Sequence, residues 1–304
     1  MIYNKYFAQV ALLAVVCAFG MRGGLCLADT QQAQDKQEMS DFSLSGFGDK
    51  GKKAWDIAGK SADIGTEVIK LNDIVGNFYG ERENITLTAE KGCFYRLEGN
   101  IHLQDNVVVT TSSGARLVTD VLDWDRNRQI IQTDRPVRLS KNNLTITGLG
   151  AKGFPDLNKL DIEKNVRVNI DESASAEGKA AQKIEITCDN SLQVDYMKNI
   201  ATFNDNVRAA TPDGIMTSNQ MELYFKREPA AGAPPGRPGV DDISAAGSRI
   251  DRILARGNVT VTRGQNVSYS EEAVYSANLK KITLSGRPKI IIYSSEGLDA
   301  PAGN

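Results

Sequence analysis

The sequence has little of what catalytic and metal-binding proteins use. Its 304 residues contain one histidine, His102, and four cysteines. No two cysteines are spaced as CxxC, so the sequence gives no support to a zinc site or a thiol redox centre. His102 lies in a strand-like pattern, and no serine or cysteine nucleophile has a recognisable setting near it. The sequence therefore predicts a protein that is not an enzyme, with no catalytic residue, no metal and no cofactor.

Convergent carboxylates and a strong charge of one sign are also missing. Glu271 and Glu272 are adjacent in the sequence, and adjacent residues of a strand point to opposite faces. Asp123 and Asp125 share a face, but they alternate with apolar residues, which indicates solvated charges opposite a buried stripe. The formal net charge is -2, so the chain has no basic field to hold nucleic acid.

The sequence has one long apolar run, at its start. Residues 6–21 are almost entirely apolar, Lys5 precedes them, and residues 26–28 (CLA) resemble a small-x-Ala cleavage site. The run is shorter than the roughly 20 residues that a membrane-spanning helix prefers. The pattern favours a secretory signal peptide over residues 1–28, and a retained membrane anchor is the alternative.

What the sequence has in abundance is a repeated nine-residue pattern: apolar, any, apolar or Thr, any, any, Asn or Pro, apolar, any, apolar. Its copies are residues 95–103, 131–139, 160–168, 201–209 and 253–261, with a looser copy at 282–290. The central residues are Asn100, Pro136, Asn165, Asn206 and Asn258. Each copy has two stretches of period-two alternation around a pair that suits a turn or bulge. Repeats in a fixed register indicate one structural unit stacked several times.

A second pattern falls between these copies, at residues 117–124, 216–223 and 268–275. In each, the apolar positions shift by one residue across a polar residue, which is Asp120, Asn219 or Glu271. A β-bulge has this effect, because one extra residue moves all later side chains to the other face and bends the strand. The sequence predicts an all-β fold made of repeated, bent, antiparallel strands.

Composition divides the chain into segments. Residues 29–41 are polar and predicted to be flexible, and residues 171–182 are small and polar and suit a linker. Residues 228–247 hold four prolines among Gly and Ala, so they must loop out of a sheet. We therefore expect β regions at 42–170 and 183–293 and a flexible tail at 294–304. Cys93 and Cys188 either form one disulfide or remain free thiols.

The two patterns together resemble the OstA-like lipopolysaccharide transport proteins, the family of LptA and LptC. In the first half, GNIHL, LVTDVLDWD, IQTDRPVRL and LTITGLGAKG are similar to LptC. In the second half, ATFNDNVRA, GIMTSNQMELYF, ILARGNVTV and SEEAVYSANLKKITLSGRPKI are similar to LptA. The resemblance covers about residues 65–293. It implies an elongated antiparallel β-jellyroll of two facing, slightly open sheets, whose interior receives the acyl chains of lipopolysaccharide.

The resemblance also implies a location and partners. A protein of this kind lies in the periplasm, binds the lipid A part of lipopolysaccharide and forms part of a bridge from the inner to the outer membrane. Its expected partners are lipopolysaccharide, other Lpt-type jellyrolls that pair through edge strands, and components of the inner-membrane ABC transporter. The strand alternation predicts which apolar residues line the interior groove. They are Leu97, Ile101, Leu103, Leu122, Trp124, Val137, Leu139, Phe203, Val207, Met221, Leu223, Val259, Val261, Tyr275 and Ile290.

Two other classes of function stay open at the level of the sequence. A structural or adhesive β-solenoid of the cell envelope would use the same apolar stripe to close a dry core, and it would carry no lipid. A glycan hydrolase would need a convergent acid pair or a nucleophile, neither of which the sequence shows. Lipid that copurifies with the protein would distinguish a transport protein from a closed solenoid.

Overall fold

The computed structural model describes residues 37–47, 51–79, 84–125, 127–128, 130–154, 159–172, 182–226, 250–279 and 281–292. These residues form one sheet of seventeen strands. The strands of the first half are β1 Gln37–Phe47, β2 Lys53–Ile64, β3 Val68–Tyr79, β4 Asn84–Tyr95, β5 Asn100–Thr111, β6 Arg116–Asp125, β7 Ile130–Lys141, β8 Leu144–Phe154 and β9 Lys159–Glu172. The strands of the second half are β10 Gln182–Cys188, β11 Leu192–Asp195, β12 Ile200–Thr211, β13 Gly214–Phe225, β14 Ile250–Arg263, β15 Asn266–Ser276, β16 Lys281–Ser285 and β17 Lys289–Ile291. The predicted fold class, an elongated all-β jellyroll, is confirmed.

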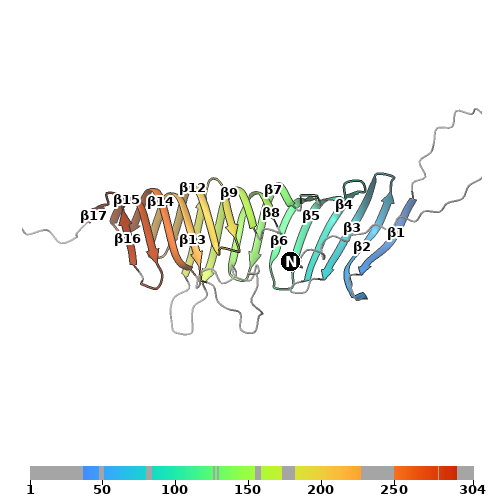
Figure 1. Cartoon of the computed structure of the whole chain (residues 1–304), viewed down its shortest axis with the longest axis horizontal. Coiled ribbons are helices and arrows are strands. Elements are labelled where there is room, and N and C mark those ends of the chain that lie inside the picture. Colours follow the sequence, from blue (N-terminus) through green and yellow to red (C-terminus); the bar gives the residue numbers. More distant parts are fainter. Residues whose placement is uncertain are drawn as a thin grey trace, which may run out of the picture.

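The order of the strands in space follows their order in the chain. Strands β1 to β9 and β12 to β15 each pair antiparallel with their neighbours in the sequence. Strands β10 and β11 share one place between β9 and β12, and β16 and β17 share one place beside β15. Figure 1 shows the result, an elongated stack with β1 at one end and β17 at the other.

This topology places the strand ends along two rims that run the length of the molecule. Strands β2, β4, β6, β8, β11, β13 and β15 end at the first rim, because the chain reverses direction at every antiparallel pairing. Strands β1, β3, β5, β7, β9, β12 and β14 end at the second rim. Backbone hydrogen bonds join neighbouring turns on each rim, for example from Ala277 N to Asp251 O at 3.0 Å and from Ser112 N to Asn84 O at 2.8 Å.

Many of the strands are bent near the middle by a bulge. In four of them an asparagine with positive φ occupies the bend: Asn106 in β5, Asn165 in β9, Asn206 in β12 and Asn258 in β14. Asparagine tolerates this left-handed conformation better than most residues with a Cβ, and the pairing register shifts at each bend. The extra residue turns the flanking side chains of β12, Phe203 and Val207, to the same interior, where both are buried. Each bent strand thus contributes one half to each of two facing half-sheets.

The first predicted copy of the repeat, residues 95–103, is in the wrong register. Its central residue, Asn100, begins β5 directly after a turn at residues 96–99, whereas the bulge of β5 lies at Asn106. Leu97, which we predicted to line the interior, lies in that turn and is 88% exposed. The apolar and polar pattern of the motif is compatible with a bulged strand. It is equally compatible with a turn followed by a strand, as at residues 196–203.

Buried apolar side chains form two clusters inside the bent sheet. The larger cluster extends from Val137 on β7 to Ala273 on β15. The smaller cluster consists of Ile74, Ala89, Leu103, Val107 and Leu122, on β3 to β6. Leu117 on β6 contacts both clusters. Strand β9 pairs with β10 over seven residue pairs, from Glu172–Gln182 to Val166–Cys188, so sheet and core continue across the predicted linker.

Several predicted boundaries shift in the structure. Strand β1 begins at Gln37, so residues 37–41 are strand rather than the flexible segment that we predicted. Strand β9 extends to Glu172 and β10 begins at Gln182, which places both ends of the predicted linker in strands. The predictions for residues 1–28, 228–247 and 294–304 lie outside the described residues. In the described part of the chain, no helix is long and apolar enough to cross a membrane.

Candidate functional site

The most buried of the predicted lining residues close the interior. They are Leu103, Leu122, Val137, Phe203, Val207, Met221, Leu223 and Val259, each at most 7% exposed. These side chains belong to the two clusters and pack against other apolar side chains, so they fill their part of the interior themselves. A ligand would have to displace them to reach this layer.

A second group of predicted lining residues is half-buried and lies nearer the strand ends. Ile101, Trp124 and Tyr275 lie toward the first rim, and Leu139 and Val261 toward the second. Leu139 and Val261 pack against the larger cluster, and Ile101 packs against the smaller one. The interior therefore combines fully buried apolar side chains with apolar side chains that remain partly exposed to water. We call Ile101, Trp124, Leu139, Val261 and Tyr275 the rim residues.

Ile290 does not belong to either layer. It lies on β17, which pairs only with β15 among the described strands, and it is 60% exposed. The prediction that Ile290 lines the interior is wrong, because no further strand of the described residues covers this end of the sheet. Its apolar side chain is instead part of an exposed edge.

Sequence reasoning missed the apolar lining of the first strands. Ile57, Leu71, Leu87 and Val109 are half-buried and pack against the smaller cluster, in the same way as Ile101. The alternation around Ile57 predicts a strand, but it does not identify the inner face because no copy of the repeat fixes the register there. These residues extend the half-buried layer across β2 to β5.

Glycines covered by aromatic rings shape the inner face at the first strands. A Cβ atom added to Gly46 on β1 would lie 2.2 Å from the ring of Trp55, the residue paired with it on β2. A Cβ atom added to Gly59 on β2 would lie 2.6 Å from the ring of Phe42. The rings therefore occupy the space that larger residues at these positions would fill, which is a known way to protect glycine in a sheet. The wall that results is flat and apolar.

The outer face of the first strands carries a polar cluster around Asp56. Its carboxylate accepts hydrogen bonds from Asn77 Nδ2 at 2.8 Å, Lys53 Nζ at 2.9 Å and Tyr79 Oη at 2.8 Å. These hydrogen bonds lower the pKa of Asp56 to about 2, and the bond from Asn77 has the largest effect. The cluster fixes the β2–β3 pair from outside and involves no inner-face residue.

The candidate acid pair of the sequence does not form a single site. Asp123 lies opposite His102, with 2.6 Å between Asp123 Oδ1 and His102 Nδ1, whereas Asp125 accepts a hydrogen bond from the backbone N–H of Arg128 at 2.9 Å. The two carboxylates thus engage separate partners. Among the described residues, no group of three or more His, Cys, Asp or Glu side chains has the arrangement of a metal site.

The cysteines are free thiols in different regions of the sheet. Cys93 on β4 is half-buried and Cys188 on β10 is buried. Burial raises the pKa of the Cys188 thiol to about 11, which suppresses the reactive thiolate. Of the two alternatives that the sequence left open, the structure has the free thiols.

Comparison with protein families gives two matches that follow one another along the chain. Residues 10–171 match the family described as lipopolysaccharide-assembly, LptC-related. The chain belongs to this family. Residues 185–297 match the family described as LptA/(LptD N-terminal domain) LPS transport protein, so the LptC-related part is followed by an LptA-like part. No curated protein matches the chain.

Both family descriptions concern lipopolysaccharide, and both fall on the same continuous sheet. The predicted resemblance of the first half to LptC and of the second half to LptA is confirmed. The LptC-related match ends at residue 171 and β9 ends at Glu172, while the LptA-like match begins within β10. The two families thus meet between paired strands, not between separate folded bodies.

Proposed function

We propose that this LptC-related protein binds lipopolysaccharide in the periplasm and shields the lipid A acyl chains inside its bent sheet. In this role it forms part of a bridge from the inner to the outer membrane. Membership of the LptC-related family and the LptA-like match support a role in lipopolysaccharide transport. The acyl-chain site within this structure is our inference.

The observation that carries the proposal is the layer of half-buried apolar side chains between the dry core and the rims. Rim residues such as Ile101, Leu139 and Val261 contact the core on one side and remain partly exposed on the other. Neighbouring strands lie about 4.8 Å apart, so an acyl chain laid across the strands would meet apolar side chains at regular short steps. Each methylene that leaves water there gains about 0.8 kcal/mol.

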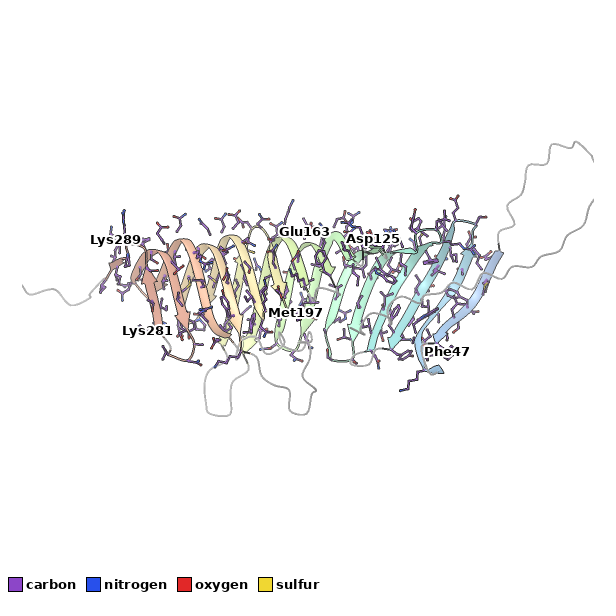
Figure 2. All side chains as sticks on the ribbon, in the orientation of Figure 1. Phe47, Asp125, Glu163, Met197, Lys281 and Lys289 are labelled. Carbon is purple, nitrogen blue, oxygen red and sulfur yellow. The ribbon has the colours of Figure 1, made fainter. Side chains whose placement is uncertain are left out.

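The two ends of the stack support the proposed contacts with other jellyrolls. Strand β1 pairs only with β2, and β17 pairs only with β15, so each end presents strand edges within the described part of the chain. Phe47 on β1 is 65% exposed and Ile290 on β17 is 60% exposed. Figure 2 places Phe47 and Lys289 at opposite ends of the long axis. An unpaired edge with apolar side chains favours strand addition by a second sheet.

Site-specific photo-crosslinking in cells tests the lipid site. A crosslinker at Leu139, which is half-buried and packs on the core, should label lipopolysaccharide. A crosslinker at the adjacent Arg138, which is exposed, should not, because adjacent strand residues face opposite sides. Equal labelling at both positions, or no labelling at Leu139 in a folded protein, would reject the groove and favour a structural solenoid with a closed core.

The same method tests the proposed partners. A crosslinker at Ile290 on the edge strand should capture another jellyroll protein of the lipopolysaccharide pathway. A crosslinker at Arg208, which is exposed in the middle of the stack on β12, should capture none. Capture at both positions with equal yield would indicate random collision, and the edge-pairing proposal would be abandoned.

A further inference from the structure

The ladder of paired strands is interrupted between β6 and β7. Val118 pairs with Arg138 and Asp123 pairs with Gln132, but residues 119–122 of β6 and 133–137 of β7 have no register partners across this interface. The other bulges interrupt a ladder over shorter stretches, for example only residues 205–206 of β12 opposite β13. We call this interruption the β6–β7 seam. It lies within the LptC-related part, far in the sequence from the predicted linker at 171–182.

Packing changes at the same place. The smaller cluster ends with Leu122 on β6, and the larger cluster begins with Val137 on β7. Among the described residues, only the half-buried Leu117 contacts both clusters. Two buried threonines face each other near the seam, Thr119 and Thr133, with a long contact of 3.4 Å between their hydroxyl oxygens. At the seam, one aliphatic side chain and one weak polar contact thus join the two cores, and the neighbouring β5–β6 and β7–β8 ladders have shorter interruptions.

A polar cavity of about 580 Å³ includes the seam. Val121 and Asp123 of β6 and Gln132, Asp134 and Arg135 of β7 form its walls at the seam, and residues of β5, β8 and β9 line the rest. Most of these side chains can interact with water, so the two walls can move apart or together without exposing much additional apolar surface. The cavity therefore leaves room for relative motion at this interface.

The sequence explains the seam through a single residue. The bulge residue that is Asn106, Asn165 or Asn258 in other strands corresponds in the repeat to Pro136 of β7. Proline fixes φ near −65°, so it cannot adopt the left-handed conformation of those asparagines, and it has no N–H to donate to a ladder. Pro136 remains paired with Leu149 on the β8 side. On the β8 side only Asp134 and Arg135 of β7 lack partners, so the interruption is longer on the β6 side.

The other proline copy of the repeat provides an independent comparison. Pro288 follows Arg287, as Pro136 follows Arg135, and there the strand is broken into β16 and β17. By contrast, the break between β10 and β11 has no proline, and backbone hydrogen bonds bridge it on both sides: Asn165 N to Asp189 O at 3.0 Å and Asp189 N to Asp205 O at 3.1 Å. Both Arg-Pro copies thus interrupt a ladder.

We propose that the β6–β7 seam, set by Pro136, is a hinge about which strands β1–β6 and β7–β17 move as two bodies. One shared core and ladders with only short interruptions keep the second body rigid. Hinge motion concentrates where packing and pairing are both weakest. The inference does not depend on lipid binding. If the proposed bridging role holds as well, the hinge would let the bridge adjust its direction while its ends stay bound.

Distance measurements between spin labels test the hinge. Labels are attached through a ketone amino acid, so that Cys93 and Cys188 stay in place. One pair, Lys91 on β4 with Lys164 on β9, spans the seam, and the control pair, Lys164 with Glu271 on β15, spans the second body; all three residues are exposed. Both pairs are five strand positions apart. We expect a broad distance distribution for the first pair and a narrow one for the control, whereas equal widths would overturn the hinge.

Substitution of Pro136 tests whether this proline causes the hinge motion at the β6–β7 seam. Pro136→Asn restores the residue of the other copies, and it should narrow the distribution of the pair that spans the seam to the width of the control pair. Pro288→Asn, at the other Arg-Pro copy, should leave both widths unchanged. A Pro136→Asn protein that stays as broad as the wild type would show that this proline does not set the hinge.

Hydrogen exchange of the unlabelled wild-type protein gives a measurement that needs no variant to fold. Amides of residues 121–122 should exchange about tenfold faster than those of residues 220–221, the corresponding residues of β13, because residues 121–122 lack partners on the following strand and residues 220–221 have them. Equal exchange rates in the two stretches would count against the hinge, even if the spin-label distributions differed.

Discussion

The two ends of this sheet differ in how completely their apolar side chains are buried. Strands β7 to β15 surround a large cluster of branched aliphatic side chains that excludes water from the bends. Strands β1 to β6 surround a small cluster, and several of their inward side chains, such as Ile57, Leu71 and Leu87, are half-buried. Both regions use bent antiparallel strands. The two regions therefore differ in how many of their apolar side chains are fully buried, not in the type of strand.

Glycine placement is part of that difference. Gly46 and Gly59 on the inner face of β1 and β2 leave space that Trp55 and Phe42 fill from neighbouring positions. The second region fills the corresponding space with residues such as Phe203 and Leu223, which interlock with their neighbours. An interior lined by flat rings over glycine is easier to open to a ligand than one made of interlocked aliphatic side chains. The following predictions test this contrast.

The largest effect is expected for a charge in the closed core. Leu223→Asp places a carboxylate at a position that is 2% exposed, and a buried unpaired charge costs several kcal/mol, enough to unfold a protein of ordinary stability. Ile101→Asp, in the first region, places the carboxylate at a half-buried position from which it can reach water, so we expect a loss of about 1 kcal/mol. Urea denaturation of both variants gives the comparison, and similar losses would show that the two interiors are equally closed.

The two cysteines should differ strongly in reactivity. At pH 8, three units below its pKa of about 11, roughly one Cys188 thiol in a thousand is ionised, and the thiol is also buried. Iodoacetamide should therefore modify the half-buried Cys93 well before Cys188, as measured by mass spectrometry of the native protein over time. Equal modification rates would indicate that the region around β10 opens as readily as the region around β4.

A smaller effect is expected for matched cavities in the two cores. Val207 and Val107 follow the bulge in equivalent positions of β12 and β5, and each is 0% exposed. Val207→Ala should lower the free energy of unfolding by about 2 kcal/mol, because the tightly packed larger core cannot collapse around the cavity. Val107→Ala should lower it by about 1 kcal/mol, since the smaller core can relax. The reverse order would mean that the first region is the more rigidly packed one.

The smallest effect concerns the polar cluster on the outer face of the first region. The pKa of Asp56 is lowered to about 2 in the folded protein, so its ionised form stabilises the fold above the normal carboxyl pKa near 4. This contribution is lost as the pH falls through about 2. Asp56→Asn should therefore reduce the pH dependence of stability between pH 4 and 2, measured by thermal unfolding. An unchanged pH profile would assign that dependence to other carboxylates.

The repeated motif predicted most of the second region well, and its failure in the first region has a physical reason. Asn165, Asn206 and Asn258 were identified as bulge positions because the same letters recur in register, and all three have positive φ. In the first copy the motif matched Asn100 in place of Asn106, because apolar alternation alone does not distinguish a turn before a strand from a bulge within one. The wrong prediction for Leu97, which is exposed, follows directly from this error in register.

The sequence predicted which side chains face the interior, but not how deeply each of them is buried. Alternation identifies the inner face, so Met221, Leu223 and Val259 were placed inside correctly. It carries no information on how many neighbouring side chains cover an inner residue, and that cover separates the buried Leu223 from the half-buried Leu139. The cover depends on the strands that pair and pack around each residue.

By itself, the sequence determined that the chain forms bent antiparallel strands, since period-two alternation, bulge asparagines and repeat spacing are local properties of the chain. We infer that it also sets the place of the β6–β7 seam, because proline at position 136 cannot take the backbone conformation that asparagine takes in the other copies. Only the tertiary structure decided where the cores end and which apolar residues remain half-exposed. Burial depends on all the strands that surround a side chain. Leu122 and Val137 belong to different cores because residues 119–122 of β6 and residues 133–137 of β7 do not pair, although the two strands are consecutive in the chain.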